Sequence, residues 1–360
     1  MKKLFVFFLT IVTMICISCN TRDMQSHNYS ENQKPRQYAF NAFDTECMIS
    51  LWGVKEDSRA EDYYYRMKSL IENYDKAFSK TNVESEIYAI NHRIDDTVYV
   101  SEEVANIFML AKDFYNWSNG KFDISAGTLF NLWDVRNRST LPSKAEIDEA
   151  LKHTANFNYN IEFLDGKDAG KAKITFFGDK ETQYDLGALV KGYCSDTLKE
   201  MLDNNHDIDA SIVNLGGNVL THGIVAGRKS GSFSVGIFKP FTTTNEIIDI
   251  VEVKDRCVIT SGNYQRYFKI DGDDRIFHHI IDPTTGYPTN NGLDSVTIVS
   301  LNGLLGDYLS TTCMLLGEED SKKLLDFANS SSAFGDKNIQ ATFVRSDGSI
   351  SKYPEKVYIK

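Results

Sequence analysis

The chain has 360 residues, of which 42% are hydrophobic, 25% charged and 12% aromatic, and it contains 6 prolines and 23 glycines. Such a composition supports a sizeable core and excludes disordered, collagen-like and low-complexity architectures. The formal net charge of −11, without any basic run, argues against a protein that wraps nucleic acid.

Residues 1–18 predict a signal peptide. Two lysines precede an apolar run of about 14 residues, which is too short to cross a bilayer comfortably but suits the hydrophobic region of a signal sequence. Ser18 followed by Cys19 resembles a bacterial lipobox, in which the cysteine becomes lipidated. The alternative is an ordinary cleaved signal peptide. Residues 19–36 are polar and aperiodic, so we expect a flexible tether. These features predict a lipid anchor on the extracytoplasmic side of a bacterial membrane, with the periplasmic side favoured.

Four further cysteines, Cys47, Cys194, Cys257 and Cys313, are scattered along the chain and show no Cys-x-x-Cys spacing. They therefore predict neither a disulfide scaffold nor a zinc site. Buried free thiols are the expected state.

After the tether, hydrophobic periodicity and capping residues predict a mixture of helices and strands. Helices are expected over residues 57–78, 101–118, 188–204 and 304–316, and another after the capping-box pattern that begins at Ser143. Strands are expected over residues 38–52, 173–177, 211–215, 233–238, 247–253, 258–260, 293–300, 340–345 and 350–359, with a hairpin within residues 264–281. This mixture favours the α+β class, in one large domain over residues 37–360.

Common catalytic motifs are absent from the sequence. It contains no Gly-x-Gly-x-x-Gly, Gly-x-Ser-x-Gly or His-Glu-x-x-His pattern, and the stretch 223–230 breaks the spacing of a phosphate loop. Instead, the chain carries a series of dense polar and glycine-bearing segments, at residues 120–127, 185–193, 214–218, 260–264, 278–286 and 307–312.

Residues 185–193 predict a glycine turn that leads into a helix with Lys191 in its first turns. The free N–H groups and the dipole at such a helix terminus suit a phosphate, and a nearby lysine adds to this. A glycine turn that only packs the helix explains the same residues. The paired glycines 216 and 217 follow an apolar strand, where they allow close approach of a ligand or form a bulge.

Asp307 and Thr311 lie four residues apart, so on a helix their oxygens face the same way. A carboxylate with a hydroxyl offers hard oxygen ligands, which suit Mg²⁺ together with water and ligand phosphates. The alternative for Asp307 is a helix N-cap.

Two adjacent histidines, His278 and His279, precede an Asp-Pro turn. A structural role is the more common one for a strand histidine, and catalysis is the alternative.

Taken together and in this order, these segments resemble the ApbE family, the FAD:protein FMN transferases. The resemblance extends from about Tyr38 to the C-terminus. It rests on residues 43–45, on 78–79 with 85–87 and 90–91, and on 120–133, 185–196, 214–218, 260–262, 279–288 and 307–317. It implies a single α+β domain related to the T-fold, with mixed, mostly antiparallel sheets and flanking helices.

The resemblance also implies an activity. FAD is the substrate and binds with Mg²⁺, a Thr hydroxyl of a target flavoprotein attacks the phosphorus on the FMN side, and AMP leaves. The acceptors so implied are flavin-carrying subunits of membrane redox complexes or extracytoplasmic reductases. Two alternatives stay open: a Mg²⁺-dependent FAD pyrophosphatase that yields FMN and AMP, and a lipid-anchored FAD-binding protein without catalysis.

Site residues follow from the same resemblance. Asp307 and Thr311 are the expected side-chain ligands of Mg²⁺, and Ala188 is expected to supply a backbone carbonyl. The residues expected to line the FAD site are Phe43, Lys121, Phe122, Asp123, Asp185, Lys191 and Ile281. Asp185 suits the adenine or ribose end of FAD. His279 is the candidate general base or phosphate-orienting group, and with Asp307 it completes the expected catalytic residues.

The chain departs from the family pattern at three places. Asp44 stands where relatives commonly have glycine, and Thr81 stands where some carry an aromatic residue. Residues 125–128, Ser-Ala-Gly-Thr, replace a more common Thr-Val-Gly-Pro. None of these departures removes an expected metal ligand, so we expect an active enzyme.

Overall fold

The computed structural model describes residues 34–224, 231–270, 272–273 and 275–355. The predicted signal peptide, Cys19 with its predicted lipidation, and nearly all of the predicted tether lie outside these ranges. None of the helices within the described ranges is both long and apolar enough to cross a membrane.

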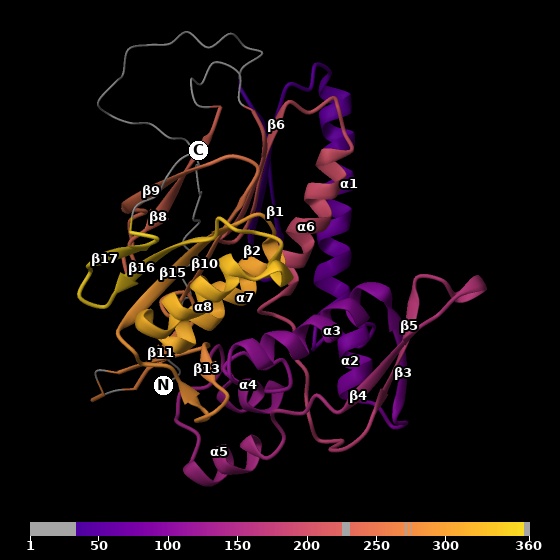
Figure 1. Cartoon of the computed structure of the whole chain (residues 1–360), viewed down its shortest axis with the longest axis vertical. Helices are drawn as coiled ribbons and strands as arrows, with labels where there is room; N and C mark the ends of the chain where they lie inside the picture. The colour runs from indigo at the N-terminus through magenta and orange to yellow at the C-terminus, as the bar shows by residue number, and fades with distance from the viewer. Residues whose placement is uncertain (1–33, 225–230, 271, 274, 356–360) are drawn as a thin grey trace, which may run out of the picture.

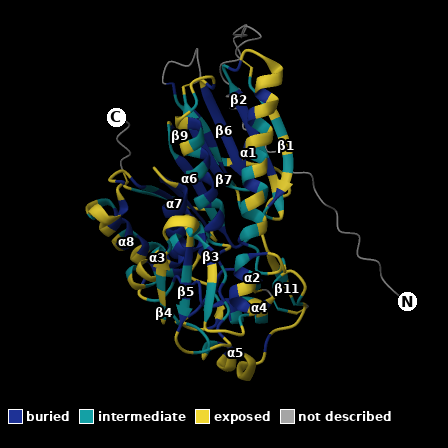
Figure 2. Cartoon of the chain, turned by 90° about the vertical axis from the view of Figure 1, so that its right-hand side faces the viewer, coloured by how far each residue is buried: buried dark blue, intermediate teal, exposed yellow. Residues whose placement is uncertain are grey.

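The fold is built on one eight-stranded sheet in which every pair of neighbouring strands is antiparallel. In spatial order its strands are β1 (Arg36–Ala42), β2 (Thr45–Trp52), β6 (Ala210–Leu215), β7 (Asn218–Gly223), β10 (Cys257–Gly262), β15 (Leu293–Ser300), β16 (Gln340–Arg345) and β17 (Ile350–Tyr353). All six residues of β6 are buried, because both faces of the sheet are covered at this strand (Figure 2).

Four helices lie on one face of this sheet: α1 (Asp57–Ala77), α6 (Val190–Asp203), α7 (Gly303–Leu316) and α8 (Glu318–Ser330) (Figure 1). The first two pack over β1, β2 and β6 through a shared apolar cluster that includes Ile49, Met67 and Leu198. On the other face lies the hairpin of β8 (Phe233–Phe238) and β9 (Ile247–Val253), whose Phe233 and Val235 pack against Ile212.

A second lobe holds a three-stranded antiparallel sheet in the order β3 (Thr97–Ser101), β5 (Lys171–Phe176) and β4 (Tyr159–Phe163). Helices α2 (Glu86–Asn91) and α3 (Glu102–Trp117) pack against this sheet. The remaining elements are α4 (Gly127–Trp133), α5 (Lys144–Leu151) and the short strands β11 (Tyr267–Lys269), β12 (Ile276–His278), β13 (Ile281–Asp282) and β14 (Tyr287–Pro288), with 3₁₀ turns at Gly166–Asp168 and Ser332–Phe334. One apolar cluster joins α3 and β5 to α7 and α8, so both lobes share a core.

Most of the local signals in the sequence are confirmed. Ser101 caps α3 by accepting a hydrogen bond from the Val104 N–H, and Ser143 forms the expected capping box of α5. The α+β class and the antiparallel arrangement are also confirmed. The four described cysteines are buried free thiols, as expected.

Several expected boundaries were wrong, and three of them have a clear outcome. The single strand expected over 38–52 is a hairpin, because Phe43 and Asp44 both adopt positive φ angles, 52° and 56°, and reverse the chain. The expected helix over 188–204 begins only at Val190. Within the described residues the last strand ends at Tyr353, one residue before Pro354, whose missing N–H cannot extend the ladder.

Candidate active site

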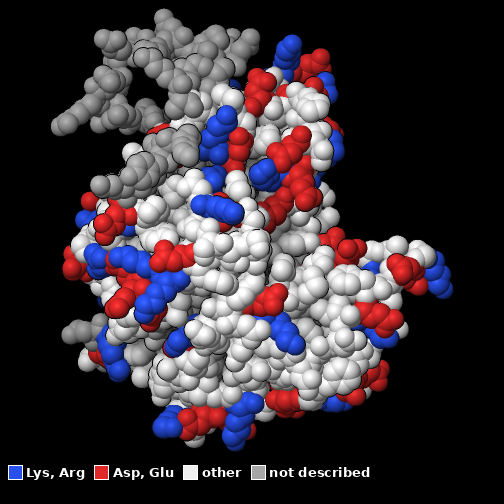
Figure 3. Space-filling view, viewed as in Figure 1, with Lys and Arg blue, Asp and Glu red and all other residues white. Residues whose placement is uncertain are grey.

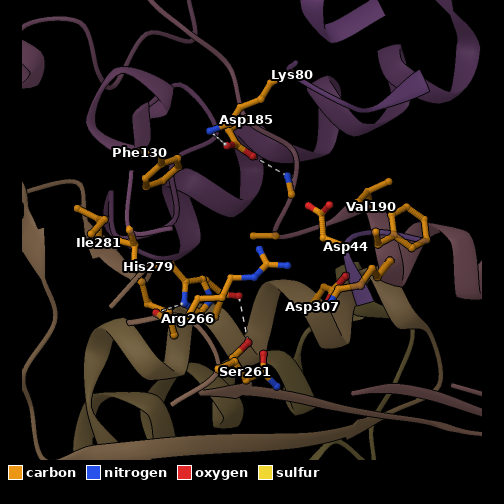
Figure 4. Close-up of a pocket in the computed structure, with 18 of the residues that line it drawn as sticks. Asp44, Lys80, Phe130, Asp185, Val190, Ser261, Arg266, His279, Ile281 and Asp307 are labelled. Carbon is orange, nitrogen blue, oxygen red and sulfur yellow. Dashed lines mark hydrogen bonds and ion pairs between the residues drawn. The ribbon is translucent and has the colours of Figure 1, made fainter. Parts of the chain in front are cut away.

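A cleft of about 600 Å³ opens where the first turns of α6 and α7 meet the β1–β2 turn and the second lobe. Every described residue that the sequence singled out for the site lines this cleft: Phe43, Lys121, Phe122, Asp123, Asp185, Ala188, Lys191, His279, Ile281, Asp307 and Thr311. These residues come from distant parts of the chain, and the fold brings them around one space (Figure 4).

Asp307 lies on α7, one turn after the helix begins at Gly303, so the interpretation of Asp307 as a helix N-cap was wrong. Its Oδ2 accepts a hydrogen bond from the Gly192 N–H at 2.5 Å, and its Oδ1 accepts one from Asn218 Nδ2 at 2.7 Å. Burial raises the pKa of Asp307 to about 6, although the Lys191 ammonium and both hydrogen bonds oppose this. The carboxylate is held in a fixed orientation at the cleft wall.

The oxygens at this end of the cleft fit a Mg²⁺ ion. Asp307 offers lone pairs beyond the two that its hydrogen bonds use, and Thr311 lies one turn further along the same helix. Ala188, just before α6, lines the same wall. Among the residues that the structure describes, no cluster of three or more His, Cys, Asp or Glu could hold a metal. A site with few protein oxygens, completed by water and ligand phosphates, is typical of Mg²⁺.

Two cations face this end of the cleft without an ion-pair partner among the described residues: Lys191 and Arg266. Burial lowers the pKa of Lys191, and the nearby Asp307 carboxylate opposes this shift. Burial also lowers the pKa of Arg266, with a further contribution from Arg136. The Arg266 guanidinium extends into the middle of the cleft (Figure 4). Cations that are desolvated and unpaired suit the oxygens of a bound phosphate.

His279 stands beside Arg266 on the same wall (Figure 4). Its Nδ1 lies 3.3 Å from the Arg266 carbonyl oxygen, which fits an Nδ1–H donor and leaves Nε2 as the acceptor. Burial lowers the pKa of His279 to about 3, and the charge of Arg266 adds to this. The ring is therefore neutral at pH 7 and able to accept a proton.

Ion pairs line the rest of the cleft. Lys80 Nζ lies 2.7 Å from Asp185 Oδ2 (Figure 4), and Arg136 Nη1 lies 2.8 Å from Asp44 Oδ2. Burial raises the pKa of Asp185, but the Lys80 ammonium and the Gly187 N–H outweigh this effect and hold its pKa below the ordinary value. In these two pairs each charged group is neutralised by its partner.

Lys121 forms a third pair of this kind. Its Nζ lies 2.6 Å from Asp282 Oδ2 and donates a hydrogen bond to Thr284 Oγ1 at 2.9 Å. A phosphate or ribose that enters this part of the cleft must therefore compete with Asp282 for the ammonium.

Three of the expected FAD-binding residues shape the wall. The carboxylate of Asp123 accepts hydrogen bonds from the Ser125 N–H, the Ser125 hydroxyl and the Ala155 N–H at 2.6–2.8 Å. Phe122 packs edge-on against Tyr308, and Ile281 belongs to a buried apolar cluster. Their contact with FAD stays a prediction.

Lys80, Arg136 and Arg266 are cleft residues that the sequence did not indicate, and Asn218 is a cleft residue whose segment the sequence singled out without a role. Lys80 and Arg266 stand close to segments that the sequence did single out, namely 78–79 and 260–264. A single charged residue carries no spacing pattern, so proximity to those segments is the only signal that could have found them.

The comparisons with known proteins decide the family. The model of the ApbE family matches residues 43–334. The chain belongs to the ApbE family. A relative from Klebsiella pneumoniae, named FAD:protein FMN transferase, is 32% identical over 268 residues, which cover 74% of this chain and 79% of the relative. A relative of the same name from Treponema pallidum is 28% identical over 325 residues, which cover 88% of this chain and 87% of the relative.

Solved ApbE structures share the fold. The ApbE protein from Thermotoga maritima superposes with a TM-score of 0.72 and 28% identity, covering 89% of this chain and 97% of that protein. The flavin transferase ApbE from Vibrio cholerae has a TM-score of 0.69 with the same coverage, and its 22% identity supports the ApbE fold alone.

Proposed function

We propose that this chain is an FAD:protein FMN transferase, which moves FMN from FAD to a threonine hydroxyl of another protein and releases AMP. One observation carries the proposal beyond family membership. The fixed carboxylate of Asp307 lies near the Lys191 ammonium, and the unpaired Arg266 reaches into the same cleft. This combination suits a diphosphate with a divalent cation. The cleft volume of about 600 Å³ lies within the range of small-molecule sites.

The reaction breaks one phosphoanhydride bond and forms one phosphoester. The acceptor hydroxyl oxygen bonds to the FMN phosphorus, the bridging oxygen leaves with AMP, and the hydroxyl proton is released. Such a transfer needs in-line positioning and neutralisation of charge on the phosphate oxygens. Water in place of the hydroxyl gives free FMN and AMP, so the acceptor decides between transfer and hydrolysis.

Asp307, Thr311 and the carbonyl of Ala188 would hold Mg²⁺ at the diphosphate. When bound, the ion neutralises charge on the phosphate oxygens and stabilises the leaving group. Lys191 and Arg266 supply further positive charge from the protein. These cations have no ion-pair partner to displace among the described residues, whereas Lys80, Lys121 and Arg136 have one.

His279 fits either of two roles, to accept the hydroxyl proton or to orient a phosphate. Its neutral ring favours proton acceptance, while its pKa of about 3 makes it a weak base until the negative diphosphate lies nearby. We expect His279→Ala to slow transfer far more than it weakens FAD binding if His279 is the base. Equal losses, in stopped-flow transfer rates and FAD titrations, would assign it to binding.

The proposal extends to the place of action. The signal-like residues 1–18 and Cys19 support a lipid-anchored protein on the extracytoplasmic side of a bacterial membrane, with residues 19–36 as its tether. Acceptors would then be flavin-carrying subunits of membrane redox complexes or extracytoplasmic reductases. The face in Figure 3 carries acidic and basic side chains interspersed, which fits a protein partner and offers no single-sign surface.

Mass spectrometry tests the proposal directly. The full-length protein in detergent is incubated with FAD, Mg²⁺ and a flavin-acceptor domain, and the acceptor is digested and sequenced. FMN attached through a phosphoester to one threonine, with an equal amount of AMP, is the expected result. An acceptor in which that threonine is alanine serves as the control. Free FMN and AMP without an adduct would indicate a pyrophosphatase, and intact FAD would indicate a binding protein.

A further inference from the structure

The first turns of α6 and α7 are in backbone contact. A Cβ atom added to Gly192 would lie 2.2 Å from the carbonyl oxygen of Gly303, and one added to Gly303 would lie 2.4 Å from the carbonyl oxygen of Gly192. Both glycines lie within regular helix, so they are needed here for the space they leave. A side chain at either position would force the two helices apart.

Each of these helices receives a carboxylate at its N-terminus from the other helix. Asp196 of α6 accepts hydrogen bonds from the Gly303 N–H at 2.6 Å and from the Leu304 N–H at 2.9 Å. Asp307 of α7 accepts the Gly192 N–H at 2.5 Å. The residues at the helices' own N-cap positions make no side-chain capping bond. The carboxylate caps are therefore exchanged between α6 and α7.

The two carboxylates differ in what they face. Asp307 lines the cleft, whereas Asp196 is not among the residues that line it. Both carboxylate oxygens of Asp196 are used by N–H groups of α7. Asp196 therefore has no direct contact with a ligand in the cleft, and its interactions act on the position of α7.

We infer that Asp196 is a positioning residue for the Mg²⁺ site, because it fixes the first turn of α7 against α6. This inference rests on the proposed function. Two of the three expected ligands, Asp307 and Thr311, follow within two turns of the capped end of α7. The third, Ala188, lies just before α6. The distance between the two groups of ligands is thus set by the helix crossing that Asp196 holds.

Mg²⁺ makes this distance matter. The ion requires near-octahedral oxygens at about 2.0–2.1 Å, so small displacements of a ligand reduce affinity sharply. A residue that only stabilises a helix end would contribute to folding stability and would leave metal affinity unchanged. The two roles are therefore separable by measuring metal binding and stability on the same variants.

The experiment uses full-length protein in detergent with FAD and compares wild type with Asp196→Asn. The amide keeps the size of the side chain but replaces one acceptor oxygen by an NH₂ group that faces a backbone N–H. Mn²⁺, followed by electron paramagnetic resonance, is the metal probe, with Mg²⁺ competition to confirm the site. We expect Mn²⁺ affinity to fall roughly 10- to 100-fold, as for other groups that orient metal ligands. Excess Mg²⁺ should restore much of the transfer rate.

Two further variants serve as matched comparisons. Ser101→Ala removes a capping hydroxyl from α3, where Ser101 accepts the Val104 N–H and does not line the cleft. It should lower the melting temperature and leave Mn²⁺ affinity unchanged. Asp196→Glu keeps the negative charge near α7 but moves it by one methylene group. We therefore expect its Mn²⁺ affinity to lie between those of wild type and Asp196→Asn. This variant also serves if Asp196→Asn does not fold.

The outcomes separate the inference from the proposed function. If the Asp196 variants lose stability but bind Mn²⁺ as wild type does, the positioning role is overturned and the proposed function stands. If wild-type protein with FAD binds no Mn²⁺, the proposed metal site fails, and the inference fails with it. Weaker Mn²⁺ binding in the Asp196 variants alone, with unchanged binding in Ser101→Ala, supports the inference.

Discussion

Two parts of the cleft are built in different ways. Where α6 and α7 meet, backbones touch, and Asp307, 5% exposed, is held by a backbone N–H and an asparagine amide. At the solvent-exposed rim, charged side chains face each other in pairs such as Arg136 and Asp44, whose side chains are 45% and 69% exposed. The first part is fixed by the fold, and the rim is held by long side chains near solvent.

This difference indicates which part of the cleft is prepared before a ligand arrives. Protein groups that neutralise the charge developing at a phosphate act best when they need no rearrangement. Exposed ion pairs contribute little to stability, so exchanging their partners costs little when a ligand enters. We therefore expect the α6–α7 end to tolerate substitution poorly and the rim to tolerate it well.

The largest effect is expected from Asp307→Ala. Loss of the expected metal ligand should reduce Mg²⁺-dependent AMP release from FAD by roughly 10²–10³-fold or more while the fold persists. The measurement is AMP release by chromatography, with circular dichroism to check folding. As a control, Asp57→Ala removes a carboxylate that is 87% exposed and should leave turnover unchanged. Undiminished AMP release in Asp307→Ala would refute the metal assignment.

A substitution at the helix crossing should be next in size. Gly192→Ala places a Cβ atom 2.2 Å from the Gly303 carbonyl oxygen, so α6 and α7 must separate. We expect a loss of about 1–3 kcal/mol in the free energy of unfolding, as for overpacked cores. Denaturant titrations measure it, and Glu200→Ala on the exposed surface of α6 is the comparison. Wild-type stability in Gly192→Ala would contradict a rigid α6–α7 end.

His279 should give a smaller, pH-dependent effect. Its pKa of about 3 in the folded state lies below the ordinary 6.5, so the folded protein binds fewer protons between these values. Stability contributed by the neutral ring is complete above pH 6.5 and is lost as the pH falls toward 3, by at most about 1.4 kcal/mol per pH unit. In His279→Gln the unfolding free energy should depend less steeply on pH between 6 and 4. If the unfolding free energies of wild type and His279→Gln depend on pH in the same way, the His279 ring is not desolvated.

The smallest effect is expected at the rim. A double-mutant cycle of Asp44→Ala and Arg136→Ala should give a coupling free energy of roughly 0–1 kcal/mol for the ion pair. Either substitution should also change the KM for FAD by only a few-fold. A coupling of several kcal/mol would remove the contrast between the rim and the α6–α7 part of the cleft.

Local signals explain most of the fold that the sequence predicted. Ser143 with Glu146 forms a capping box within one turn, and the apolar pattern of β16 alone defines Gln340–Arg345. The turn at Phe43 and Asp44 escaped prediction because neither residue is a glycine and both adopt positive φ. In such a case tertiary contacts, rather than residue preference, decide the backbone conformation.

The site was predicted in a different way. Its residue types are individually common. The segments that carry them occur in the same order as in the ApbE family, and this order indicated that they form one site. Contacts between distant segments were not predictable, because no local pattern encodes them. Asp196 illustrates this limit, since its capping partners, Gly303 and Leu304, lie on another helix far along the chain. Lys80 is a second case, because its partner Asp185 belongs to a separate segment.

The order of segments around the cleft has a consequence for the newly made chain. Phe43 lies near the start of the described chain and Thr311 near its end, and β2 and its partner β6 both precede α7 in the sequence. A nascent or partly translocated chain that lacks α7 also lacks Asp307, so it cannot assemble the phosphate end of the cleft. Catalytic competence should therefore be acquired only when synthesis and any translocation are nearly complete.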